Sequence, residues 1–133
     1  MTVKTYHGSC HCGAVRYEAD IDLSKGSSRC NCSICRKTRA WGVGVKPAAF
    51  RLISGKDQLG SYKFGRAGAH KFCGLCGTRT FGEFNIPEIG GETVSIQIAT
   101  LDATDEELAA TPIMYCNGRD NDWWHAPAIA SYL

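Results

Sequence analysis

The sequence predicts a mainly β fold with one short helix. Val15 and Tyr17 alternate with Arg16 and Glu18, which is the period of a half-buried strand. Glycine makes up 15 of the 133 residues and recurs between short segments of this kind, where it favours turns. A helix start is recognisable toward the C-terminal end. Many short strands joined by glycine-rich turns are therefore expected.

The expected elements follow one another at short intervals. Strands are predicted over residues 3–10, 12–21, 28–32, 41–46, 50–54, 61–64, 70–73, 78–84 and 93–101. Residues 23–28 are expected to be a loop, and residues 34–40 a single helical turn. The helix is predicted to begin at Thr104, since Thr104 and Glu107 match a capping box, and to run to about Ala110 before Pro112 ends it.

Length and composition favour one domain over residues 1–133, with room for one modest core. Residues 1–5 do not lead into the apolar core of a signal peptide, and no apolar run has the length of a membrane span. The expected location is cytoplasmic, with no membrane partner. In a reducing compartment, eight cysteines indicate metal binding rather than disulfides.

Three of these cysteines fall within six residues. Cys30 and Cys32 lie two apart on a predicted extended segment and so point to the same face. The next two residues allow a turn that returns Cys35 to the same point. Three sulfurs leave a tetrahedral ion one ligand short, and a catalytic zinc keeps a position open where a structural zinc is closed by four ligands. The pattern therefore indicates a reactive site.

Cys73, Cys76 and Gly77 form a Cys-x-x-Cys-Gly motif. In a zinc knuckle of this kind, backbone amides point at the thiolates, and the glycine takes a left-handed conformation without steric cost. A redox pair is the alternative, but such a pair is exposed at a helix N-terminus in a βαβ setting. The neighbours here are predicted strands, which favours metal binding.

Counting alone leaves the partition of the cysteines open. The knuckle supplies two ligands, and Cys10 and Cys12 at the tip of the first hairpin are the obvious second pair. Two of the three central cysteines could instead close a site with either pair. In a further alternative both metals are structural, with His11, Cys116 or another side chain as the eighth ligand.

Seven of the eight cysteines lie in three segments: Gly8-Ser9-Cys10-His11-Cys12-Gly13-Ala14-Val15, Cys30-Asn31-Cys32-Ser33-Ile34-Cys35-Arg36-Lys37 and Phe72-Cys73-Gly74-Leu75-Cys76-Gly77-Thr78. These segments resemble the successive signatures of the glutathione-dependent formaldehyde-activating enzyme family, whose pattern the centromere protein V domain shares. Their order, spacing and flanking residues fit, and the resemblance extends over about residues 2–124.

The resemblance implies a β-tent fold, in which short antiparallel sheets are clamped by a structural zinc. The implied ligands of this zinc are Cys10, Cys12, Cys73 and Cys76. A second zinc is implied on Cys30, Cys32 and Cys35, facing a cleft. Cys116 is not a ligand in this pattern and is most simply a small buried hydrophobe.

The implied activity is that of a carbon–sulfur lyase resembling S-(hydroxymethyl)glutathione synthase, with Cys30, Cys32 and Cys35 as its catalytic ligands. Zinc lowers the pKa of a coordinated thiol, so a glutathione sulfur at the open position would be a thiolate at neutral pH. Its attack on formaldehyde or a related aldehyde gives the S-hydroxymethyl adduct. The expected partners are a glutathione-like thiol and an aldehyde. The alternative is a zinc-stabilised thiol-binding or protein-interaction module without turnover.

The charge balance bears on the partners as well. From the formal charge of +2, seven thiolates and two Zn²⁺ ions together subtract three charges and leave −1. A near-neutral molecule offers no general electrostatic case for nucleic-acid binding. Arg36 and Lys37, next to the thiols, would bind substrate carboxylates or balance thiolate charge. With Trp41, they are the predicted substrate-binding residues.

Two interpretations are open for the aromatic residues Trp41, Phe64, Trp123 and Trp124. They would either wall a substrate cleft or belong to the core, and the core is the commoner place in a small β domain. His125 would be a proton shuttle or, more simply, a surface histidine.

Overall fold

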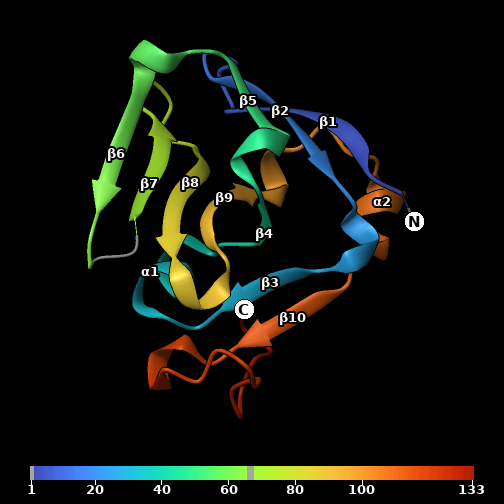
Figure 1. Cartoon of the computed structure of the whole chain (residues 1–133), viewed down its shortest axis with the longest axis vertical. Helices are drawn as coiled ribbons and strands as arrows, with labels where there is room; N and C mark the ends of the chain where they lie inside the picture. The colour runs from blue at the N-terminus through green and yellow to red at the C-terminus, as the bar shows by residue number, and fades with distance from the viewer. Residues whose placement is uncertain (1, 66–67) are drawn as a thin grey trace.

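The computed structural model describes residues 2–65 and 68–133, which form two β-sheets (Figure 1). The smaller sheet is antiparallel and has the strand order β1–β2–β5. Its strands are β1 (Lys4–Ser9), β2 (Arg16–Ile21) and β5 (Phe50–Ser54). The hairpin of β1 and β2 is the one that the alternation at residues 15–18 predicts.

The larger sheet has the strand order β10–β3–β4–β9–β8–β7–β6. Its strands are β3 (Ser27–Cys30), β4 (Gly42–Val45), β6 (Leu59–Lys63), β7 (Gly68–Cys73), β8 (Arg79–Ile86), β9 (Gly91–Gln97) and β10 (Ile113–Cys116). Its pairs are antiparallel except β10 and β3, which are parallel. β3 and β4 share one register pair, and Figure 1 shows β3 and β10 running across the direction of β8 and β9. The sheet therefore bends at this junction.

The hydrophobic core lies between the two sheets. Tyr17 of β2 and Val94 and Ile96 of β9 are among its buried side chains. The ring of Phe50 lies 5.4 Å from the ring of Tyr17 and 4.6 Å from that of Phe81, which joins β5 to both sheets. Full burial of a Val, Ile or Phe side chain contributes about 1.5–3 kcal/mol, so this interface is the main source of hydrophobic stabilisation.

Both helices are short. α2 (Asp105–Ala110) begins at the predicted capping box, in which Thr104 Oγ1 accepts from Glu107 N–H and Glu107 Oε1 accepts from Thr104 N–H, each at 3.1 Å. α1 (Ser33–Thr38) is followed by its C-cap residue Arg39, whose φ is +51°. The described residues thus form two α-helices where the sequence predicts one. Of residues 34–40, which are expected to form one turn, residues 34–38 belong to α1, whose N-cap residue Cys32 makes no side-chain capping hydrogen bond.

Short 3₁₀ turns connect the described elements: η1 (Leu23–Lys25), η2 (Pro47–Ala49), η3 (Lys56–Gln58), η4 (Pro87–Ile89), η5 (Ile98–Thr100) and η6 (Gly118–Asp120). The sequence did not predict β10, because its partner β3 lies far away in the chain. Within the described ranges, no helix has the length and apolarity that crossing a membrane requires.

Candidate metal centres and the cavity beside them

A group of four cysteines joins the two sheets. Cys10 and Cys12 lie in the turn between β1 and β2, while Cys73 ends β7 and Cys76 lies in the turn before β8. Their four Sγ atoms all lie within 4.8 Å of one another. The group therefore links a hairpin of the smaller sheet to a hairpin of the larger one.

The spacing of these sulfurs fits a tetrahedral zinc ion. With Zn–S bonds of about 2.3 Å, the sulfurs of such a site are about 3.8 Å apart. Cys12 Sγ lies 3.7 Å from Cys10 Sγ and 3.7 Å from Cys73 Sγ. Four protein sulfurs at this spacing could hold one metal ion with every tetrahedral position filled.

Backbone amides face two of the sulfurs. Val15 N–H donates to Cys10 Sγ at 3.3 Å, and Leu75 N–H donates to Cys73 Sγ at 3.4 Å. Such donors stabilise thiolates, which are the form that binds a metal. The second of these contacts is the amide-to-sulfur contact predicted for the knuckle.

The end of the knuckle is also arranged for a thiolate. Thr78 Oγ1 lies 3.3 Å from Cys76 Sγ, and this hydrogen bond first, then the backbone amides of Cys12 and Thr78, lower the pKa of Cys76 to about 5. Gly77 has a φ of +79°, the left-handed conformation that the motif predicts for glycine. The turn is flanked by strands β7 and β8 rather than by the helix that a redox pair would precede.

The second group of cysteines lies where β3 leads into α1. Cys30 ends β3, Cys32 is the extended N-cap residue of α1, and Cys35 lies in the first turn. Their Sγ atoms lie within 4.8 Å of one another, and Cys32 N–H donates to Cys30 Sγ at 3.3 Å. Among the described residues, no fourth His, Cys, Asp or Glu belongs to this group. Three sulfurs thus converge as their spacing predicts.

The three thiols do not ionise alike. The pKa of Cys32 is lowered first by its hydrogen bond with Cys30 and then by its hydrogen bond with Cys35. The pKa of Cys35 is raised first by its hydrogen bond with Cys30 and then by its hydrogen bond with Cys32. The contacts among the three sulfurs therefore favour the thiolate form at Cys32. A cluster of this kind could hold a metal ion.

A cavity of about 680 Å³ opens beside the three-cysteine group. Its described lining includes the three cysteines, residues of β4, β7, β8 and β9, and residues of the segment 118–123. The three-cysteine group is therefore part of a cavity wall, and the four cysteines of the other group are not among the described lining residues.

The floor of this cavity is the face of the larger sheet that points away from the core. The floor residues are small or polar: Gly42, Gly44, Thr93, Ser95 and Gln97. They alternate along β4 and β9 with the core residues Val43, Val45, Val94 and Ile96. A Cβ added at Gly44 would lie 3.1 Å from Thr93 Cγ2, so a larger residue there would fill the hollow.

The charged side chains of the cavity are basic. Among the described lining residues, Arg79 and Arg119 are cationic and none is Asp or Glu. Arg79 Nη1 donates to Thr38 Oγ1 at 2.9 Å, and its Nη2 donates to His70 Nδ1. Burial lowers the pKa of His70, and the charge of Arg79 lowers it further. A neutral ring is also what acceptance at Nδ1 requires.

A comparison with protein families places this geometry in a known context. The family model described as glutathione-dependent formaldehyde-activating enzyme matches residues 5–118, a range that contains both cysteine groups. The chain belongs to this family.

Individual relatives agree with the assignment to different extents. A Halomonas elongata protein, named as a candidate glutathione-dependent formaldehyde-activating enzyme, is 54% identical over 35 residues, which are 26% of this chain and 22% of that protein. The match thus spans about a fifth of the relative's length. A crystal structure of a Rhodobacter sphaeroides protein is similar with a TM-score of 0.68 and 30% identity, over 81% of this chain and 99% of that one. This second likeness shows the fold.

In this member of the formaldehyde-activating family, the predicted substrate-binding residues lie outside the described cavity lining. Arg36 and Lys37 are exposed on α1, with the Arg36 guanidinium 5.8 Å from the ring centre of Tyr132. Trp41 is half-buried against the core and donates from Nε1 to Ser27 Oγ at 2.7 Å. Their role in binding stays a prediction.

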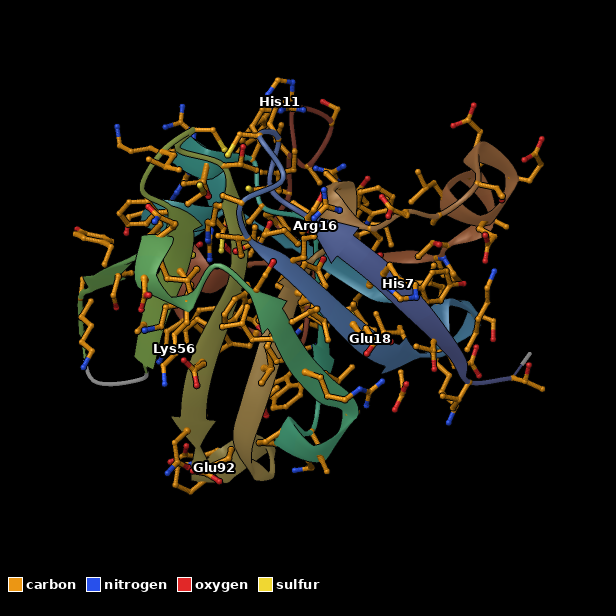
Figure 2. All side chains as sticks on the ribbon, turned by 90° about the horizontal axis from the view of Figure 1, so that it is seen from above. His7, His11, Arg16, Glu18, Lys56 and Glu92 are labelled. Atoms are coloured by element: carbon orange, nitrogen blue, oxygen red, sulfur yellow. The ribbon has the colours of Figure 1, made fainter. Side chains whose placement is uncertain are left out.

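The aromatic and histidine candidates differ in whether they line the cavity. Phe64 and Trp123 line the cavity and are 44% and 46% exposed, whereas Trp124 is 74% exposed and is not in the described lining. His125 is exposed, as expected for a surface histidine. His11 is exposed in the turn after β1 (Figure 2) and belongs to neither cysteine group.

Sequence reasoning missed the site residues that approach the cysteines only through the fold. Arg79, His70 and Arg119 carry no local signal that connects them to the segment 30–35. The cavity floor does have a local sequence signal, because glycine alternates with valine along β4 and small polar residues alternate with apolar ones along β9. Strands are predicted over residues 41–46 and 93–101, but neither face of them is assigned to a cavity from the sequence.

Proposed function

We propose that this chain is a zinc-dependent carbon–sulfur lyase resembling S-(hydroxymethyl)glutathione synthase, which joins a glutathione-type thiol to formaldehyde or a related aldehyde. The observation that carries the proposal is the difference between the two cysteine groups. Four sulfurs complete one group, whereas the three sulfurs of the other lie in the wall of a cavity of about 680 Å³. A group of three beside a cavity suits an exchangeable fourth ligand.

Cys30, Cys32 and Cys35 would hold the zinc of this site. When bound, the ion lowers the pKa of a thiol ligand, so that the substrate sulfur is a thiolate at neutral pH. A sulfur lone pair then forms the bond to the aldehyde carbon, and the C=O π pair moves to the oxygen, which takes up the proton that the thiol gave up. In reverse, the C–S bond breaks and the aldehyde leaves.

The remainder of the cavity contributes size and polarity. A volume of about 680 Å³ is within the range of about 300–1,000 Å³ typical of small-molecule sites and suffices for a tripeptide thiol. Ile34, Phe84 and Trp123 supply apolar walls that reduce access of water to the reacting carbon. The small residues of the floor leave room for the adduct.

A second candidate, thiol binding without turnover, is favoured by a different observation. The described lining holds no carboxylate, and His70 already uses Nδ1 to accept from Arg79. The described lining residues thus include no evident side chain to move the proton. Addition of thiols to formaldehyde also proceeds without a catalyst. A measurement of turnover distinguishes the two functions.

The exchange of ¹³C-formaldehyde with its glutathione adduct can be followed by NMR in zinc-loaded protein, with the spontaneous rate subtracted. We expect exchange above the spontaneous rate in the wild type and in Cys116→Ser, the matched control that removes a thiol outside both groups. Cys32→Ser should return the rate to the spontaneous value. A wild-type protein with both sites filled and no acceleration would refute the lyase and leave thiol binding.

A further inference from the structure

Arg79 occupies an unusual position for a charged side chain. It lines the cavity, is half-buried, and has no carboxylate partner among the described residues. Its Nε is buried and has no hydrogen-bond partner within the described part of the chain. A half-buried guanidinium without a carboxylate partner is costly unless other negative charge or hydrogen-bond acceptors compensate for it.

The neighbours of Arg79 hold it in one orientation. Thr38 Oγ1 donates its proton to Ile34 O at 2.8 Å, so its lone pair is free to accept from Arg79 Nη1. On the other side, Arg79 Nη2 donates to His70 Nδ1. The guanidinium is therefore fixed between the end of α1 and strand β7, and each Nη keeps a second N–H for another acceptor.

His70 is itself held by aromatic rings. Its ring stacks on Phe64 at 5.7 Å and meets Phe84 edge-on at 5.2 Å, and both of these phenylalanines line the cavity. His70 is 7% exposed, which leaves little freedom to turn away from Arg79. The Arg79 fork is thus preorganised, which lowers the entropic cost of binding an anion.

The negative charge of the three cysteine thiolates does not balance all of the positive charge in the cavity lining. Three thiolates with one Zn²⁺ carry a net charge of −1, which one cation neutralises. Arg79 and Arg119 supply two cations, and His70 is held neutral by its role as acceptor. On this formal count one positive charge of the described lining is left unmatched, with Arg79 half-buried and Arg119 exposed and donating from Nη2 to the Tyr132 hydroxyl.

We propose that Arg79 is a specificity-determining residue that binds a carboxylate of the thiol substrate, with Arg119 as the second cation of the same cavity. The proposal rests on the proposed function, because it assumes a thiol at the three-cysteine group. It also defines the substrate class. The described lining offers no acidic partner for an ammonium group, so a carboxylate is the charged group that the site selects.

Binding of three small thiols to zinc-loaded protein tests this by calorimetry. In each of these thiols, two carbons separate the sulfur from a second functional group. This group is a carboxylate in 3-mercaptopropionate, a hydroxyl in 2-mercaptoethanol and an ammonium in cysteamine. We expect 3-mercaptopropionate to bind about tenfold or more tightly than 2-mercaptoethanol, the scale of one charge-assisted hydrogen bond, and cysteamine to bind most weakly.

Variants assign that preference to a residue. Arg79→Gln should reduce the affinity for 3-mercaptopropionate about tenfold and leave that for 2-mercaptoethanol unchanged. Arg79→Lys should retain part of the preference, because it keeps the charge and loses the planar fork. The matched control is Arg16→Gln, which removes an exposed arginine of β2 outside the described lining and should change nothing.

The Nε–H resonance of Arg79 in a ¹⁵N spectrum gives a readout that needs no variant and no sulfur. Succinate should shift this resonance in the wild type. A succinate shift without binding of any thiol would sustain the carboxylate site and refute the proposed lyase.

Three outcomes would overturn the inference while leaving the lyase intact. One is equal wild-type affinity for 3-mercaptopropionate and 2-mercaptoethanol. Another is an equal loss of affinity for both thiols in Arg79→Gln, which would mean that Arg79 balances the charge of the cysteine thiolates. The third is loss of the preference in Arg36→Gln with Lys37→Gln while Arg79 is intact.

Discussion

Cys116 of β10 lies opposite Cys30 of β3 in the parallel pairing that closes one side of the larger sheet. The chain then continues past the three-cysteine group, and a Cβ added at Gly118 would lie 2.6 Å from Cys30 Sγ and 2.6 Å from the Trp123 ring. The segment after β10 therefore packs directly on the sulfur of a proposed ligand. Only a glycine leaves that space.

Gly118→Ala should accordingly disturb the three-cysteine group and spare the other one. The added methyl group must displace either Cys30 or the rigid Trp123 ring, because 2.6 Å is far below a van der Waals contact. We expect the variant to fold and to keep one zinc ion while the second is lost to mild chelation. Zinc content by mass spectrometry, with Cys116→Ser as the control, tests this. Retention of both ions with unchanged chelation would contradict it.

The two cysteine groups should differ in what they do for stability. Metal binding at a structural site is worth about 10–16 kcal/mol, comparable to or above a typical stability of about 5–15 kcal/mol, so loss of a ligand there unfolds a small domain. Cys73→Ser should therefore give unfolded or insoluble protein, and Cys32→Ser should remain folded. Circular dichroism and thermal unfolding distinguish these results. Equal unfolding of both variants would mean that both metals are structural.

Filling the cavity floor should block the thiol without touching the core. Ser95 points into the cavity, while its neighbours Val94 and Ile96 point into the core. Ser95→Leu should reduce thiol affinity about tenfold or more through steric overlap. Both zinc ions should stay bound. Glu92→Leu, an exposed change on the same strand (Figure 2), is the control. Unchanged affinity in Ser95→Leu would place the thiol elsewhere.

Acid should weaken the contact between β1 and α2. The Tyr6 hydroxyl donates to Glu107 Oε2 at 2.5 Å, and this bond first, then the Thr104 amide and Lys4, holds the pKa of Glu107 at about 2. A depressed carboxyl pKa contributes stability that is present above the ordinary value of 4.5 and is lost as the pH falls toward 2. The difference in unfolding free energy between wild type and Glu107→Gln should shrink over that window.

Glu107→Gln suits this comparison because glutamine keeps an oxygen for the capping bond to Thr104. Urea denaturation of both proteins at matched pH values gives the difference between their unfolding free energies. Loss of metal in acid destabilises both proteins alike, so it cancels in this difference. A difference that stays constant from neutral pH to pH 2 would show that Glu107 does not stabilise the fold through its charge.

Local signals in the sequence predicted much of this molecule. The capping box at Thr104 and the left-handed Gly77 of the knuckle are set by residues within one turn, and both are confirmed. The convergence of Cys30, Cys32 and Cys35 also follows from spacing alone. In each case, chain geometry over a few residues determines the outcome.

Features that depend on distant pairing were not predictable in the same way. β10 is short, and its parallel register on β3 depends on contacts across most of the chain. The basic residues show the same difference. Arg36 and Lys37 follow Cys35 in sequence, but each helical residue turns about 100° from the last, so adjacency on α1 does not mean a shared face. Arg79 approaches the site through the fold instead, on β8.

The central claim is that the three-cysteine group accepts a thiol as a further ligand and the four-cysteine group does not. Cobalt(II) absorption tests it most directly, because sulfur-to-metal charge-transfer bands grow with the number of thiolate ligands. In protein loaded with Co²⁺ at both sites, titration with glutathione should raise these bands to saturation at one thiol per chain, and Cys32→Ser should abolish the rise. Bands that stay unchanged in the wild type, or that rise equally in Cys32→Ser, would contradict the account.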